Sequence, residues 1–190
     1  LHPRVRRQRQ MCIRDSFGRV TEEKGVETVI KAYEKLPEYT VKIMGDDTTD
    51  EAKRLKKYVE NHKMKNVEFL GFKSGAELEN VIKGARFTLI PSIWYDNLPN
   101  TALESFQYSK PVIASNIGSL PELVIDGENG YLFKPSNVED LIKKIKMLDD
   151  DTLVKKMGQA SRKRLESRFA PQTHYEDLMK IFNEAVKSRK

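Results

Sequence analysis

The chain has 190 residues, the size of one globular domain with at most a small appendage. Hydrophobic residues make up 38% of it and there are only eight prolines and ten glycines, so it can bury a core and is unlike disordered, collagenous or coiled-coil proteins. No run approaches the length of about 18 apolar residues that spans a membrane. The single cysteine, Cys12, excludes an internal disulfide and a cysteine-built zinc site.

The net charge of +6 is concentrated at the N-terminus. Residues 1–16 carry five arginines and one aspartate, which leaves 29 basic and 27 acidic side chains in the other 174 residues. The fold itself therefore has no predicted basic face, and we expect no nucleic-acid partner. Residues 1–16 show no hydrophobic period, so we interpret them as a non-domain tail, foreign or disordered, and place the domain at 17–190. In the alternative, an arginine-driven nucleic-acid binder, deleting this tail would abolish binding.

From Phe17 onward, short apolar runs alternate with segments of helical periodicity. The runs predict strands at 39–45, 67–71, 87–91, 111–115 and 131–133. The intervening periodicity predicts helices at 24–36, 49–63, 75–85, 100–108, 120–125 and 138–148. This alternation is typical of crossover connections, so the expected fold is α/β, a Rossmann-like parallel sheet with helices on both faces.

The last forty residues predict two helices and no strand. In the terminal helix, 171–190, Pro171 suits the first turn. Its apolar residues follow a three-and-four spacing: Tyr175, Leu178, Met179, Phe182, Ala185 and Val186. That spacing indicates an amphipathic helix.

Open parallel sheets bind ligands in loops at the carboxyl ends of their strands. The first such loop, 17–25, contains Gly18, which lets the backbone approach a ligand. Arg19 and Lys24 place two cations beside a helix start, a combination that suits a phosphate. The alternative is a solvated charged turn capped by Thr21.

The second loop, 91–104, leaves an apolar strand and enters a helix. Backbone amides near the helix start would face a ligand; these belong to Asn97, Leu98, Asn100 and Thr101. One turn later, Glu104 could accept hydrogen bonds from vicinal hydroxyls.

The alternative for this second loop is structural. Asn100 would then cap the helix, Glu104 would lie on a solvated face, and Trp94 and Tyr95 would pack in the core. Taken alone, the residues of this loop slightly favour the structural interpretation.

In a third loop, Ser119 and Glu122 have the spacing of a helix capping box, so a structural role explains both residues. Any contact with a ligand in this loop would come from backbone amides near Gly118. The histidines His2, His62 and His174 are scattered, and the sequence has no glycine-rich nucleotide motif of the GxGxxG or GxxxxGK type. Hydrolase and metal chemistry are therefore not expected.

Six segments occur together in an order typical of one family: FGRVTEEKGVETVIKAYEKL, VKIMGD, VEFLGF, PSIWYDNLPNTALESF, KPVIASNIGSLPELVIDGENGYLFKP and MGQASRKRLESRF. From Phe17 to Phe169 the sequence resembles the C-terminal, donor-binding domain of the retaining glycosyltransferases of family 4, the group 1 family of GT-B fold. The resemblance implies hexosyl transfer from a nucleotide-diphosphate sugar to an acceptor hydroxyl, with retention of configuration.

By this resemblance, Arg19 and Lys24 match the pair that grips the diphosphate, and Glu104 matches the second carboxylate of the family's Glu, seven residues, Glu motif. The first carboxylate is Asp96, one methylene shorter than the usual glutamate. The resemblance implies that backbone amides within 97–101 contact the donor's sugar and phosphates. It also implies that Gly45, Gly71 and Phe72 lie beside the base and ribose. It implies no metal cofactor.

The resemblance also implies the donor, the acceptor and the partner domain of the chain. The donor is a nucleotide-diphosphate sugar, and the acceptor is a sugar, lipid-linked glycan or polysaccharide whose identity resides in a missing N-terminal GT-B domain. We expect the chain alone to be inactive and cytoplasmic, with peripheral membrane contact in the full-length enzyme. The alternatives are a non-catalytic nucleotide-sugar-binding module and a GT-B relative, such as a sugar-nucleotide epimerase or a glycogen-type synthase.

The sequence departs from the family before Phe17. Relatives have an apolar strand there, whereas this chain has Met-Cys-Ile-Arg-Asp-Ser, a poor central strand. This is the basis for predicting a foreign segment joined to a truncated gene. In relatives the terminal helix packs across onto the N-terminal domain, so we expect its apolar face to be exposed or locally refolded here.

Overall fold

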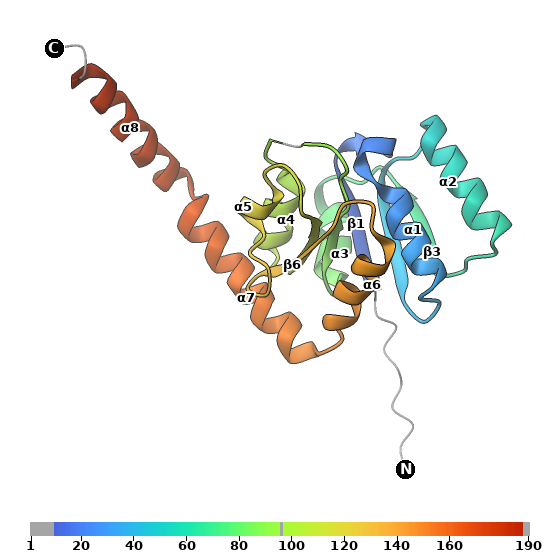
Figure 1. Ribbon diagram of the computed structural model, residues 1–190. Helices are drawn as coiled ribbons and strands as arrows, with labels where there is room; N and C mark the ends of the chain where they lie inside the picture. Colours follow the sequence, from blue (N-terminus) through green and yellow to red (C-terminus); the bar gives the residue numbers. More distant parts are fainter. Residues whose placement is uncertain (1–9, 96, 188–190) are drawn as a thin grey trace.

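The computed structural model describes the backbone of residues 10–95 and 97–187, and the side chains from Val20 onward within these ranges. A parallel sheet of six strands in the order β3-β2-β1-β4-β5-β6 forms its centre (Figure 1). The strands are β1 (Gln10–Arg19), β2 (Thr40–Asp46), β3 (Val67–Gly71), β4 (Thr88–Ile90), β5 (Val112–Ser115) and β6 (Gly130–Phe133). The predicted fold class is confirmed, with every predicted strand present.

The first strand corrects the prediction of a non-domain tail up to residue 16. Gln10 pairs with Thr40 of β2, and Cys12 lies between Lys42 of β2 and Thr88 of β4. A central strand receives backbone hydrogen bonds from both neighbours, so its position in the sheet outweighs a side-chain composition that disfavours a strand. Residues 1–9, the rest of the predicted tail, lie outside the described part of the chain.

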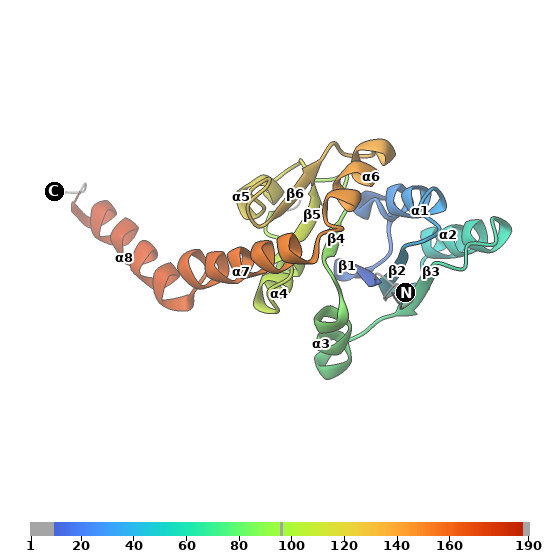
Figure 2. The ribbon, with the colours of Figure 1, turned by 90° about the horizontal axis from the view of Figure 1, so that it is seen from below.

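Helices cover both faces of the sheet (Figure 2). One face carries α1, α2 and α6, and the other carries α3 and α4. The helices are α1 (Val26–Glu34), which follows the 3-10 turn η1 (Glu22–Lys24), α2 (Asp50–Asn61), α3 (Gly75–Gly84), α4 (Asn100–Gln107), α5 (Leu120–Leu123), α6 (Val138–Met147), α7 (Asp151–Arg168) and α8 (Pro171–Lys187). They match the predicted helices to within a few residues.

Each face of the sheet has its own hydrophobic core. On the α1 face, residues such as Ile30, Tyr33 and Ile43 are almost completely buried. On the α4 face, Phe106 packs with Leu120 and neighbouring apolar residues. Because both faces are covered, strands such as β5 are buried at every position, as parallel strands require.

Helix α7 ties the end of the chain to the α4 face. A Cβ atom on Gly158 would lie 2.1 Å from the backbone oxygen of Ser109, so only glycine permits this approach of α7 to the turn after α4. One turn further, the Ser161 hydroxyl donates to the Asn129 carbonyl at 2.9 Å. These two contacts fix α7 against the domain.

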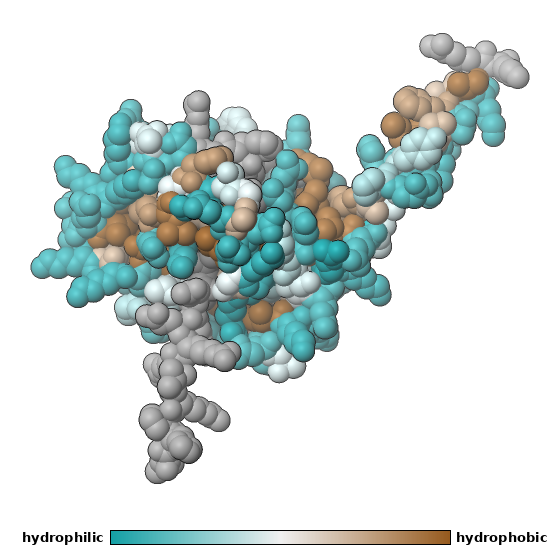
Figure 3. Space-filling model, turned by 180° about the vertical axis from the view of Figure 1, so that it is seen from behind, coloured by the Kyte–Doolittle hydropathy of each residue, from teal (hydrophilic) through white to brown (hydrophobic). Residues whose placement is uncertain are grey.

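Helix α8 continues beyond α7 and projects away from the domain (Figure 1), and apolar side chains gather along it (Figure 3). Tyr175, Phe182 and Val186 are all more than half exposed. The predicted amphipathic helix is therefore present, with its apolar face exposed as expected. Among the described residues, no helix is both long and apolar enough to cross a membrane.

The close contact at Gly158 gives a stability prediction. Gly158→Ala should lower the free energy of unfolding by about 1–3 kcal/mol, because the new methyl group meets backbone that cannot easily move. Gly84→Ala is the matched control: its Cβ would meet nothing within 4 Å, and we expect no loss of stability or a gain of up to about 1 kcal/mol. Urea denaturation of both variants measures the difference, and equal effects would contradict the packing argument.

Candidate functional site

The strand order places a topological switch point between β1 and β4, where a ligand-binding crevice is expected. These strands are neighbours at the centre of the sheet, yet the chain leaves β1 toward one face and β4 toward the other. In open α/β sheets this reversal opens a ligand-binding crevice at the carboxyl ends of the two strands. The loops that border it are 20–25 and 91–99, so the first two predicted loops meet at one place.

Hydrogen bonds join these two loops directly. The backbone N–H of Ile93 donates to the carbonyl oxygen of Glu23 at 2.8 Å, and the Ser92 hydroxyl donates to the same oxygen at 3.2 Å. Gly25 has a φ of +66°, and a Cβ atom there would lie 2.0 Å from the carbonyl oxygen of Pro91. The loops are therefore in backbone contact and form one structural unit.

A third segment, after β2, joins the same unit. The Val20 N–H donates to the carbonyl oxygen of Asp46 at 3.0 Å, and the Thr49 hydroxyl donates to the carbonyl oxygen of Val20. The Asp46 side chain accepts hydrogen bonds from Thr48, which closes the turn. The carboxyl ends of β1, β2 and β4 are thus held together by main-chain contacts.

The two residues that were predicted to supply cations lie at the end of β1 and in the turn that follows it. Arg19 is the last residue of the strand and pairs with Asp46 of β2, and Gly18 precedes it. Lys24 ends the 3-10 turn, is partly exposed and comes directly before Gly25, the residue in contact with the β4 loop. Thr21 precedes this turn, but its side chain makes no capping hydrogen bond, so the proposed Thr21 cap is wrong.

Helix α4 begins at the opposite border of the crevice. Pro99 occupies the N-cap position, and no side chain in the described part of the chain caps the helix. Asn100 is the first helical residue and is exposed, so its predicted capping role is wrong. An uncapped helix start presents backbone N–H groups and a partial positive charge, which favour an anion.

The other predicted residues of this segment lie around that helix start. Asn97 and Leu98 are exposed in the loop, and Thr101 is buried in the first turn. The Oγ1 atom of Thr101 is buried and has no hydrogen-bond partner among the described residues. Glu104 is partly buried, with its Oε2 atom shielded from solvent. Asp96 lies outside the described residues.

The carboxyl end of β3 forms the outer edge of the same surface. Gly71 ends β3, and the position a Cβ would take there is 3.8 Å from a carboxylate oxygen of Asp47. Asp47 forms an ion pair with Lys56 at 2.6 Å. Phe72 follows and is 64% exposed, and Gly45 lies within β2, next to the residue that pairs with Gly71.

Two further predictions concern the third loop and metals. The Ser119 side chain does not cap α5, because Ser119 has helical backbone angles rather than the extended conformation of a capping residue; the predicted capping box with Glu122 is wrong. Within the described residues, no group of three or more His, Cys, Asp or Glu side chains is arranged to hold a metal ion. Independence from metal remains a prediction.

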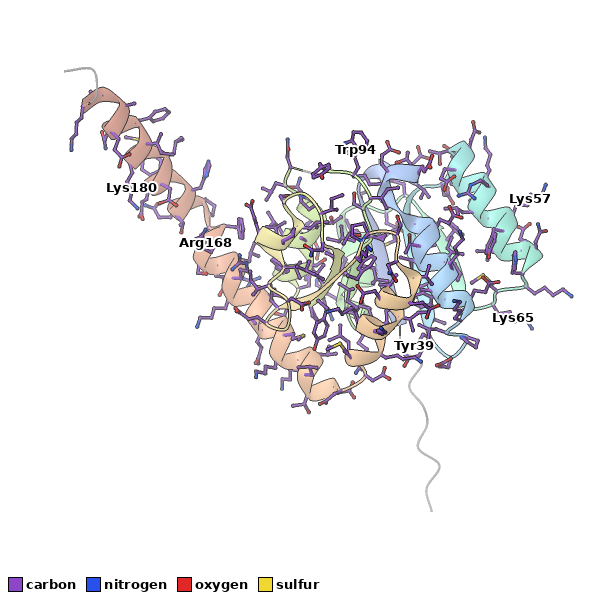
Figure 4. All side chains as sticks on the ribbon, in the orientation of Figure 1. Tyr39, Lys57, Lys65, Trp94, Arg168 and Lys180 are labelled. Carbon is purple, nitrogen blue, oxygen red and sulfur yellow. The ribbon has the colours of Figure 1, made fainter. Side chains whose placement is uncertain are left out.

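Sequence reasoning missed the residues that hold the loops together. Ser92 and Glu23 are 69 positions apart, and their contact is through a backbone oxygen, so no motif signals it. It also left open a core position for Trp94 and Tyr95, which are in fact 64% and 73% exposed. Figure 4 shows Trp94 at this edge of the sheet, pointing away from the domain.

A parallel sheet in this order, with helices on both faces and an uncapped helix start beside its switch point, defines a Rossmann-like domain. The model of the family "Glycosyl transferases group 1" matches residues 16–164, and the chain belongs to this family. The chain is 30% identical over 168 residues to an uncharacterized glycosyltransferase, MJ1178, of Methanocaldococcus jannaschii, covering 88% of this chain and 46% of that protein. It is 32% identical over 166 residues to a glycogen synthase of Mycobacterium tuberculosis, covering 82% and 38%.

Solved structures agree with the fold. The structure is similar to the C-terminal domain of the group 1 family protein LpcC from Francisella tularensis, with a TM-score of 0.73, 26% identity and coverage of 85% of this chain and 86% of that chain. It is also similar to Anabaena HepE in complex with UDP-glucose, with a TM-score of 0.82, 21% identity and coverage of 94% and 49%. The chain therefore corresponds to a C-terminal GT-B domain and spans less than half the length of the curated relatives named above.

The contact between Gly25 and Pro91 can be tested by substitution. Gly25→Ala should destabilise the domain through its positive φ, by about 1–2 kcal/mol, and further through the clash with the Pro91 carbonyl. Gly75→Ala is the matched control, because Gly75 also has a positive φ but its Cβ would meet nothing within 4 Å.

Amide hydrogen exchange measures the hydrogen bond between the Ile93 N–H and the Glu23 carbonyl directly. In Gly25→Ala, the peptide containing Ile93 should exchange faster, because its N–H loses the Glu23 acceptor, whereas Gly75→Ala should leave that peptide unchanged. Equal protection of Ile93 in both variants would show that the loops do not depend on this contact.

Proposed function

We propose that the chain is the donor-binding half of a retaining glycosyltransferase and binds a nucleotide-diphosphate sugar in the crevice between the β1 and β4 loops. The observation that carries this proposal is the junction of these loops at the Glu23 carbonyl. It sets Lys24 on one border of the crevice and the uncapped start of α4 on the other. Two sources of positive potential then face one anionic group.

We assign the diphosphate to the space between Lys24 and the start of α4. Lys24 and Arg19 would bind the phosphate oxygens as charge-assisted donors. As the bond between sugar and phosphate breaks, negative charge grows on the leaving phosphate, and fixed positive groups stabilise that charge. The helix start contributes in the same sense through the amides of Asn100 and Thr101, and the preceding loop through those of Asn97 and Leu98.

The sugar and ribose hydroxyls are assigned to the carboxylates of the second loop. Glu104 lies one turn into α4 and is partly buried, and its carboxylate would accept hydrogen bonds from two vicinal ribose hydroxyls. The buried Thr101 hydroxyl lies in the first turn of α4, three residues before Glu104. Asp96 would contact the transferred sugar. Gly45, Gly71 and Phe72 would border the base, where the exposed Phe72 ring offers a flat apolar surface.

The proposed reaction exchanges one glycosidic bond for another. The bond from the anomeric carbon to the phosphate oxygen breaks, and the acceptor oxygen forms the new bond on the same face of the sugar. The acceptor proton passes to the departing phosphate, so no covalent enzyme intermediate and no metal are required. Because the chain spans less than half of its relatives' length, the acceptor site would belong to a second domain, and this chain alone would transfer little.

Isothermal titration of the chain with UDP, GDP and ADP tests the donor site. We expect selective binding of one nucleotide, weakened about tenfold or more by Lys24→Ala, because a charge-assisted hydrogen bond contributes about 1.5–3 kcal/mol. Glu104→Ala should also weaken binding through loss of the ribose contacts. Lys57→Ala, on an exposed position of α2 away from the crevice, is the control and should bind as the unchanged chain does (Figure 4).

A folded chain that binds none of the three nucleotides would contradict the proposal. Equal losses in Lys24→Ala and Lys57→Ala would show that charge alone, rather than the crevice, attracts the nucleotide. Circular dichroism of each variant establishes that it is folded before the titration.

A further inference from the structure

Large apolar side chains are exposed at the carboxyl edge of the sheet. Apart from those on α8 and Met147, the exposed large hydrophobic residues in the described part of the chain lie on just two loops. Phe72 follows β3, and Trp94, Tyr95 and Leu98 follow β4. Exposed apolar groups that gather at one place mark a binding surface, whereas scattered ones need no explanation.

The main chain that carries Trp94 is fixed although its ring is exposed. The Trp94 N–H lies 3.4 Å from the Ser92 hydroxyl oxygen, and the Trp94 carbonyl oxygen lies 3.2 Å from the same atom. Ser92 is 1% exposed and also contacts the Glu23 carbonyl. The backbone from which the ring projects is therefore held in place at this edge of the sheet, which reduces the conformational entropy that is lost when a ligand contacts the residue.

The neighbouring polar groups indicate which ligand suits these rings. Asn97 and Asn100 are exposed within a few residues of Tyr95, and each amide can both donate and accept a hydrogen bond. A pyranose ring has one face of C–H groups that stacks on an aromatic ring, and hydroxyls at its rim that bond to amides. An aromatic surface next to asparagine side chains provides both kinds of contact.

We propose that Trp94 and Tyr95 form a stacking platform for a pyranose ring beside the donor crevice. This inference rests on the proposed function, because a glycosyltransferase handles a sugar ring at this edge from the donor, the acceptor or both. Trp94 stacks on the C–H face of the ring, Tyr95 extends the apolar surface, and the platform determines which sugar is accepted rather than how the nucleotide is held.

The sequence contains a single tryptophan, so the fluorescence of the whole chain reports on Trp94 alone. The chain is titrated with the nucleotide that calorimetry selects, with the matching nucleotide-glucose, and with maltotetraose, cellotetraose and chitotetraose at saturating nucleotide. Stacking should shift the emission to shorter wavelength and protect Trp94 from acrylamide quenching. A response to nucleotide-glucose beyond that to nucleotide assigns the platform to the donor sugar, and a response to an oligosaccharide assigns it to the acceptor.

Variants separate the platform from the nucleotide site. Calorimetry with the responding sugar should show about three- to tenfold weaker binding in Trp94→Ala and Tyr95→Ala, as expected for loss of one aromatic contact, with unchanged affinity for the nucleotide alone. Phe182→Ala, which removes an exposed aromatic ring from α8, is the control and should bind sugar normally.

The platform is overturned if the nucleotide binds but no sugar changes the emission of Trp94, a result that leaves the proposed function intact. It is also overturned if Trp94→Ala binds the responding sugar as the unchanged chain does. A sugar response without any nucleotide binding would support the platform and contradict the donor site.

Discussion

The carbonyl oxygen of Glu23 is the contact on which the site depends. It accepts hydrogen bonds from the Ile93 backbone and the Ser92 hydroxyl, and so joins the loop after β1 to the loop after β4. The junction is possible because Gly25 has no side chain where the Pro91 carbonyl approaches. Loops are ordinarily the variable part of such a fold. Here hydrogen bonds to one carbonyl oxygen hold two of these loops together at the topological switch point of the sheet. The surface that they form therefore has a fixed geometry.

Charged, polar and apolar groups lie around that junction. Lys24 precedes Gly25 on one side of it and the uncapped start of α4 follows the β4 loop on the other, Glu104 lies one turn into α4, the Asp47–Lys56 ion pair follows β2, and exposed aromatic residues follow β3 and β4. A nucleotide-diphosphate sugar has the corresponding parts: an anionic centre, hydroxyl groups and flat apolar faces. The apolar face of α8 lies away from this surface, on a helix that leaves the domain (Figure 1). The crevice is therefore defined without α8.

The fold was predictable because its signals are local. Apolar runs such as 87–91 and 111–115 alternate with helical periods, and this pattern alone specifies a parallel sheet covered on both faces. Strand β1 was missed at residues 10–16 because Arg14 and Asp15 disfavour a buried strand, and its place depends on pairing with β2 and β4. The turn that contains Lys24 and the start of α4 were also predicted from local signals, and their roles in binding stay predictions. The Ser92–Glu23 contact and the exposure of Trp94 did not, since both arise from the packing of segments distant in the sequence.

The central claim is that the joined loops form one nucleotide-binding surface, and amide chemical shifts of the isotope-labelled chain test it most directly. Adding the nucleotide selected by calorimetry should shift amides in four segments together: 20–25, 45–47, 71–73 and 97–104. Amides at the opposite edge of the sheet, such as those of 62–66, and those of α8 should stay unchanged. Shifts confined to the opposite edge or to α8, or shifts in the β4 loop without any in the β1 loop, would contradict the account.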